Sequence, residues 1–112
     1  MLGLSLHLEG KAKEVLTYDD VKRGFVVRLG GGTGRLKVIA LKRRSDGLYL
    51  MARTTVLLKG REVEMYLKPT RPIYSSNYPY SLTGGKAPKG IVIIQNLGDE
   101  PVDIDEVEVE VR

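Results

Sequence analysis

Residues 36–58 read LKVIALKRRSDGLYLMARTTVLL, two apolar segments with alternating polar side chains on either side of the short stretch 45–47. Alternation with a period of two is typical of β-strands with one buried face. A three-residue connection with glycine where a left-handed backbone is needed predicts a β-hairpin, with Gly47 at positive φ. The register that follows pairs Ala40 with Ala52, Val38 with Thr54, and Leu36 with Val56. These pairs give the hairpin one small, apolar face, which the core of the fold should bury.

The next turn, at Lys59-Gly60, predicts that a third strand continues the same sheet. The expected pairs are Val56 with Val63, Thr54 with Met65, and Ala52 with Leu67. They keep the same face apolar, so local turn chemistry and burial pattern agree.

The glycine run GGGTG, residues 30–34, is similar in composition to a phosphate-binding loop. Such a loop ends in Gly-Lys-Ser/Thr and leads into a helix, whereas here a strand begins at Arg35. We therefore interpret the run as a flexible hairpin connection from Leu29 to Leu36, with enough slack for Gly32 to accept alanine.

The whole chain reads as short strands without helices. We expect eight of them, at residues 2–9, 14–18, 25–29, 35–43, 48–58, 61–68, 90–95 and 101–111. This pattern predicts an all-β fold, an antiparallel β-sandwich of jelly-roll-like type in one domain over 1–112, with a small closed β-barrel as the alternative. Ile104 and Val107 are out of phase, which predicts a bulge near residues 105–106.

Composition narrows the class of protein. The 112 residues include no cysteine, which excludes disulfides and thiolate metal sites. No segment approaches the roughly 18 apolar residues of a membrane-spanning helix, and the first ten residues lack the features of a signal peptide, so we expect a virion or cytoplasmic protein. Amide side chains are few beside abundant Lys, Arg and Glu, a bias associated with thermophiles.

Charge is divided between the two parts of the chain. Residues 1–72 have 15 Lys and Arg against 7 Asp and Glu, and residues 73–112 have 3 against 7. We expect the basic strand and the acidic tail to attract each other, within one copy or between copies. The residues expected to carry this attraction are Arg35, Lys37, Arg43, Arg44, Glu106, Glu108 and Glu110. The three glutamates should form the outer row of an edge strand or meet a neighbouring copy.

No set of residues predicts catalysis. His7 is the only histidine and should be a solvated side chain on a strand face. The acids at 99–105 could bind calcium weakly, but they lack the central glycine and the terminal glutamate of an EF-hand loop. We therefore expect a protein that is not an enzyme, with no cofactor and no metal.

The outer face of the predicted hairpin is unusually apolar. Ile39, Leu41 and Met51 lie on it among basic side chains, and a solvent face would hold fewer large apolar groups. Either the chain itself or a partner should cover them. We expect Glu62 and Glu64 to offset part of the basic charge on this face, near Lys37 and Arg53.

A long loop, residues 69–90, contains Tyr74, Tyr78 and Tyr80 between prolines and glycines. Long loops in compact domains are usually functional, and tyrosine is common at interfaces. We expect these tyrosines to contact a neighbouring subunit. The alternative is an arm that folds over its own sandwich.

Two functions remain in view. The first is a structural module that assembles with copies of itself or with other proteins, as in virus capsids, decoration or tail proteins, or surface layers. The alternative is a nucleic-acid-binding module that uses the basic residues within 21–45, a stretch without any acid. Carbohydrate binding by the tyrosine loop is a minor alternative.

Overall fold

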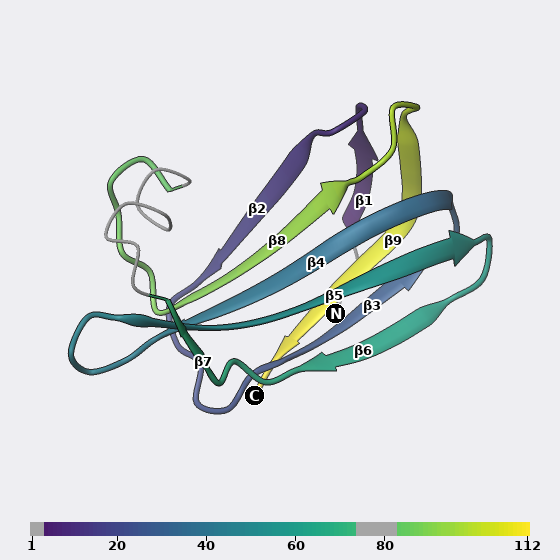
Figure 1. Cartoon of the computed structure of the whole chain (residues 1–112). Coiled ribbons are helices and arrows are strands. Elements are labelled where there is room, and N and C mark those ends of the chain that lie inside the picture. The colour runs from purple at the N-terminus through teal and green to yellow at the C-terminus, as the bar shows by residue number, and fades with distance from the viewer. Residues whose placement is uncertain (1–3, 74–82) are drawn as a thin grey trace.

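The computed structural model describes residues 4–73 and 83–112 as two antiparallel β-sheets packed face to face (Figure 1). The strands are β1 (Leu4–Leu8), β2 (Lys13–Tyr18), β3 (Phe25–Gly30), β4 (Thr33–Arg43), β5 (Tyr49–Lys59), β6 (Val63–Leu67), β7 (Arg71–Ile73), β8 (Gly90–Asn96) and β9 (Val102–Val111). The prediction of an antiparallel β-sandwich is confirmed. All eight expected strands are present, and the short β7 is the one that the sequence pattern missed.

The strand pairs nest inside one another along the chain. Sheet A has the order β1-β9-β3-β6, and sheet B has the order β2-β8-β4-β5-β7. The innermost pair is the hairpin β4–β5, and successive outer pairs join β3 with β6, β2 with β8, and β1 with β9. Only the β4–β5 pair is made by strands that follow each other directly, so most of the sheet depends on distant segments meeting.

The core lies between the two sheets and takes one side chain in two from each strand. From β3 it takes Phe25, Val27 and Leu29, all fully buried. Sheet B contributes side chains of the same kind from facing strands: Leu36, Val38, Ala40, Val92 and Ile94. This alternation follows from the pleat, which sends successive side chains to opposite faces of a sheet. Every strand therefore has a core side and an outward side.

The predicted hairpin register is confirmed residue by residue. Ala40 pairs with Ala52 and Leu36 with Val56, and Gly47 has a φ of +88°. The local signal was sufficient here because a short loop fixes the register of the two strands that it joins.

The predicted continuation of that sheet through Lys59-Gly60 is wrong. β6 crosses to the other sheet, where Met65 pairs with Val27 and Leu67 with Phe25. The predicted inward side of β6 is nevertheless correct, since Val63 and Met65 pack against the core. A strand beside β5 and a strand opposite it need the same apolar side, so the burial pattern could not distinguish the two arrangements.

The interpretation of the glycine run as a flexible hairpin connection is also wrong. It joins β3 in sheet A to β4 in sheet B, and it packs closely against β9. Gly32 has a φ of +78°, and a Cβ atom there would lie 2.4 Å from the backbone oxygen of Asp103. Glycine is required at Gly32 because the crossing leaves no room for a side chain there.

The predicted bulge near residues 105–106 is confirmed. Between the pairs Leu4 with Val107 and Leu6 with Ile104, β9 has one residue more than β1. However, β9 lies between β1 and β3, so it is an inner strand, and the prediction that it forms an edge is wrong.

A single buried amide joins the turns at one end of the sandwich. Asn96 is fully buried, and its side-chain NH2 donates to the carbonyl oxygens of Leu8, Glu9 and Glu100, the last at 2.7 Å. Its carbonyl oxygen accepts from the N–H of Gly98. With all these bonds made, a buried polar group stabilises the fold instead of costing free energy.

We predict that Gly32→Ala destabilises the protein more than Gly47→Ala. Both positions have positive φ, which costs an alanine about 1 kcal/mol. Only at Gly32 would the new methyl group also meet backbone atoms, whereas nothing lies within 4 Å at Gly47. The free energy of unfolding from urea denaturation should fall by at least about 1 kcal/mol more for Gly32→Ala. Equal decreases in the free energy of unfolding would show that the β3–β4 connection can accommodate a methyl group at Gly32.

Candidate functional site

The outward side of sheet A is acidic. Strand alternation places five carboxylates there: Glu64, Asp103, Glu106, Glu108 and Glu110. The only Arg or Lys at the outward strand positions of this sheet is Arg28, in the middle. Tyr66 lies among these charges and is 50% exposed. We call this surface the acidic face.

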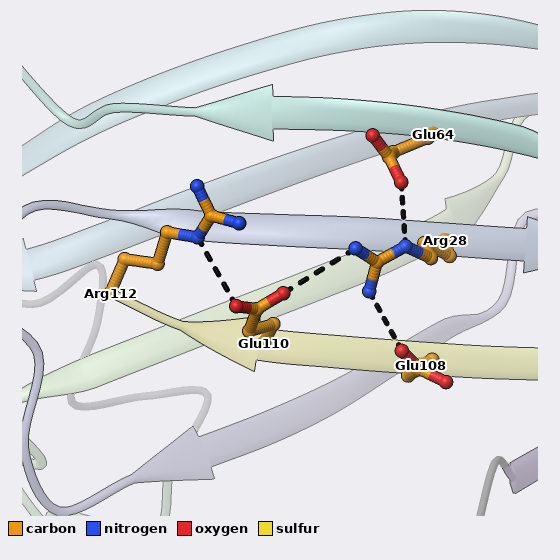
Figure 2. Close-up of polar contacts among 5 residues, drawn as sticks. All are labelled: Arg28, Glu64, Glu108, Glu110 and Arg112. Atoms are coloured by element: carbon orange, nitrogen blue, oxygen red, sulfur yellow. Dashed lines mark hydrogen bonds and ion pairs between the residues drawn. The ribbon is translucent and has the colours of Figure 1, made fainter. Parts of the chain in front are cut away.

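Arg28 holds three of these carboxylates together (Figure 2). Its Nε donates to Glu64 at 2.6 Å, and its Nη1 donates to Glu108 at 2.7 Å. Its Nη2 reaches Glu110 at 3.4 Å. The three glutamates come from strands on both sides of β3, so one guanidinium joins β6, β3 and β9 across the sheet.

The charges in this cluster stabilise one another. Bonds from Arg112 and then from Arg28 hold the pKa of Glu110 below its ordinary value, so the group is ionised at neutral pH. The hydrogen bond with Glu64, followed by that with Glu108, raises the pKa of Arg28. Three carboxylates share two cations, Arg28 and Arg112, so the cluster stays negative after pairing.

His7 lies on the same outward side of sheet A, opposite Asp103, and is exposed, as the sequence predicts. Its Nε2 is 2.9 Å from Glu9, and its Nδ1 is 2.5 Å from Asp103. These bonds, that with Glu9 first, raise the pKa of His7 above its ordinary value. Two carboxylates do converge on the ring, one on each ring nitrogen.

The outward side of sheet B is basic. Its strand positions hold seven Lys and Arg residues and no carboxylate: Lys13, Arg35, Lys37, Arg43, Arg53, Lys59 and Arg71. Among the described residues, Arg43 is the only one of the seven with a side-chain hydrogen bond, and none forms an ion pair. Leu57, opposite Arg35 in the register, is 56% exposed. We call this surface the basic face.

A second apolar cluster is buried on the same side of sheet B. It comprises Ile39, Leu41, Tyr49, Ile91 and Ile93, with Met51, Val15 and Ile73 packed against it. Leu41 is fully buried and Met51 only partly so. The chain itself therefore covers Ile39 and Leu41, which is one of the two expected alternatives. A contact of Ile39, Leu41 and Met51 with a partner stays a prediction. The surface left open lies around Leu57.

The described end of the long loop is bound to this chain's own sheet. The Tyr49 hydroxyl donates to the Pro88 carbonyl at 2.6 Å, and the Arg43 guanidinium donates to the Ala87 carbonyl at 2.6 Å. Residues 83 and 86–88 also line a cavity of about 590 Å³ with Val15 and Thr17 of β2. For this segment the structure agrees with an arm over its own sandwich. Tyr74, Tyr78 and Tyr80 lie outside the described residues, so their contact with a neighbour stays a prediction.

The basic stretch 21–45 does not form one surface. Arg28 lies on the acidic face, and Arg44 pairs with Asp46 at 3.0 Å in the hairpin loop. Lys42 donates to the carbonyl of Lys22 at the end of the sandwich. The expectation that Glu64 offsets Arg53 is wrong, because Glu64 belongs to sheet A and bonds to Arg28.

Chemical sites are scarce in the part of the chain that the structure describes. Residues 4–73 and 83–112 hold no group of three or more His, Asp or Glu side chains placed to bind a metal ion. They contain no helix of the length and apolar character needed to cross a membrane. The two oppositely charged faces are therefore the features that set this surface apart.

The comparisons with known proteins add no family. The chain matches no family model, and no curated protein is significantly similar to it in sequence. The function must therefore be argued from the two faces themselves.

Sequence reasoning missed part of the basic face. It found Arg35, Lys37 and Arg43 on β4 and Arg53 on β5, but it did not connect them with Lys13 and Arg71, which come from distant segments. The period-two pattern was visible in each strand. The sequence does not give the strand order in the sheets, and this order determines which strands contribute outward side chains to the same face.

We predict that Arg28→Met lowers the melting temperature by a few degrees at low salt, because Glu64, Glu108 and Glu110 would lose their shared cation. The loss should shrink at about 1 M salt, where the screening length is about 3 Å. Arg53→Met is the matched control, since Arg53 has no ion pair among the described residues, and it should leave the melting temperature unchanged or higher. Equal, salt-independent losses for both would contradict the role given to Arg28.

Proposed function

We propose that this protein is a non-enzymatic assembly module whose basic face binds a protein partner. The observation that carries the proposal is the concentration of seven bases, without a carboxylate, on one side of sheet B. Such a surface repels itself, and the single chain supplies no described counter-charge to relieve it. A partner with carboxylates would stabilise it.

The exposed Leu57 supports a protein partner in particular. Apolar anchors within a polar rim are characteristic of protein interfaces, where the centre is depleted in charge. Leu57 has Arg35 opposite it and Lys59 two positions on, so it is an apolar point inside a charged surround. The chain leaves it open although similar side chains on the same sheet are buried.

The strand order supports the same class of function by analogy. The nested pairs β1–β9, β2–β8, β3–β6 and β4–β5 agree with a jelly-roll-like arrangement. Jelly rolls recur in viral capsid and lectin domains. Fold alone never fixes function, so this argument only adds to the one from the surface.

Nucleic acid is the second candidate for the basic face, since unpaired Lys and Arg side chains also suit phosphates. Binding of single strands usually adds aromatic side chains on which bases stack. Among the described residues the only aromatic side chain on this side of sheet B is Tyr49, and it is buried. The exposed Leu57 is the observation that favours a protein partner.

We predict that wild-type protein forms species heavier than the 12.4 kDa monomer at low salt, measured by sedimentation or native mass spectrometry. Leu57→Asp should raise the dissociation constant at least about tenfold, because it removes the apolar contact and places a carboxylate against the carboxylates of the partner. Leu48→Asp is the control: Leu48 is 41% exposed in the hairpin loop, away from the basic face, so assembly should be unchanged. A wild-type monomer at every concentration, or equal effects of both variants, would contradict the proposal.

A further inference from the structure

We infer that the partner of the basic face is the acidic face of a second copy of this chain, so that copies stack head to tail. The inference rests on the assembly function proposed above and names the occupant of that surface. Three properties of the two faces carry it: their charges, their positions on opposite sides of the sandwich, and their size.

The charges are complementary. The basic face has seven positive side chains, and the acidic face has five carboxylates against Arg28. Each face also exposes one large apolar side chain among its charges, Leu57 on the first and Tyr66 on the second. Opposite charge around an apolar contact is the arrangement that steers and orients protein partners.

The attraction cannot be satisfied within one copy by these side chains. The inward sides of β4 and β9 both contribute to the core between the sheets, through Val38 on one strand and Val107 on the other. Their outward side chains therefore point away from each other, with the whole sandwich between them. The expected attraction between the basic strand and the acidic tail is left to act between copies.

The faces have the area of an interface. β4 and β5 have eleven residues each, so they are about 36 Å long at about 3.3 Å per residue. The other three strands of sheet B are shorter, and the 38 residues of its five strands, spaced about 4.8 Å apart, give an outward area on the order of 600 Å². This is the lower end of the roughly 600–1,000 Å² that a standard protein interface buries on each partner.

The placement of the faces also determines the kind of assembly. Two different surfaces on one chain form a heterologous interface, which gives a closed ring or an open stack but not a two-fold dimer. Because the faces lie on opposite sides of one sandwich, each added copy leaves a free face at either end. The species formed should therefore increase in length with concentration.

The test uses two full-length variants with reversed charge. One reverses the basic face and leaves only Lys13 and Arg43 of its bases: Arg35→Glu, Lys37→Glu, Arg53→Glu, Lys59→Glu and Arg71→Glu. The other reverses the acidic face and inverts the pairing around Arg28, with loss of the Arg112–Glu110 pair: Arg28→Glu, Glu64→Lys, Glu106→Lys, Glu108→Lys and Glu110→Lys. Circular dichroism and thermal melting confirm that each variant folds, and the first variant alone still supports the test if the second does not fold.

Each folded variant should be monomeric where wild type assembles, with a dissociation constant at least about 100-fold higher, because like charges would meet at the interface. An equal mixture of the two should assemble again in alternation. If the acidic-face variant is unstable, the basic-face variant can be titrated into wild type. It should bind one end of a stack through its acidic face and prevent further addition there, so that the stacks become shorter.

Failure of the inference differs from failure of the proposed function. Wild-type assembly that either variant retains, or that the mixture does not restore, would mean that the basic face has another protein partner. Wild type that stays monomeric but binds single-stranded DNA through the basic face, with loss of binding in the first variant, would overturn both and assign the face to nucleic acid.

Discussion

The structure depends on one constraint, which is that two sheets share a single core. Each strand must give one side to that core, which is built from apolar side chains such as Phe25, Leu36 and Val107, with the hydrogen-bonded Asn96 at one end. With 29% of its residues charged, the chain must place its charges on the two outward sides and at the ends. The outward sides of the two sheets face in opposite directions. If the strands of one sheet carry more acids and those of the other more bases, the molecule has one acidic and one basic surface.

The difference in this protein is one of sign. Sheet A contains the acidic β9, and it tolerates the carboxylates because Arg28 lies in the strand beside them. Sheet B contains the basic β4 and has no such counter-charge at its outward strand positions. The acidic side is therefore partly neutralised by Arg28, while the basic side has no ion pair among the described residues. This asymmetry links the arrangement of strands to the proposed assembly.

The sequence predicted what local chemistry determines. Strand positions, the register of the hairpin at Gly47 and the bulge in β9 each follow from a few neighbouring residues. The position of β6 did not follow, because a strand beside β5 and a strand across the core need the same apolar side. The constraint at Gly32 was missed because it arises from contact with Asp103, far away in the chain.

The candidate site was harder to predict for a related reason. Charge along the chain indicated a basic part and an acidic part, and the structure places most of each on its own sheet. However, Arg28 and Glu64 lie on the acidic side although they come from the basic part, and their pairing needed the order β9-β3-β6. Lys13 and Arg71 joined the basic face only through the pairing of β2 and β7 into sheet B.

The most direct test of head-to-tail contact is a zero-length cross-link between an amine and a carboxylate. Lys37 and Glu108 lie on opposite sides of the sandwich, so no such link can form within one copy. Wild-type protein mixed from isotopically light and heavy copies would be treated with a carbodiimide at low salt and digested. The account predicts Lys37–Glu108 or Lys37–Glu106 links in mixed-isotope pairs, with loss of these links at high salt. Assembled protein without any link between the two faces would contradict it.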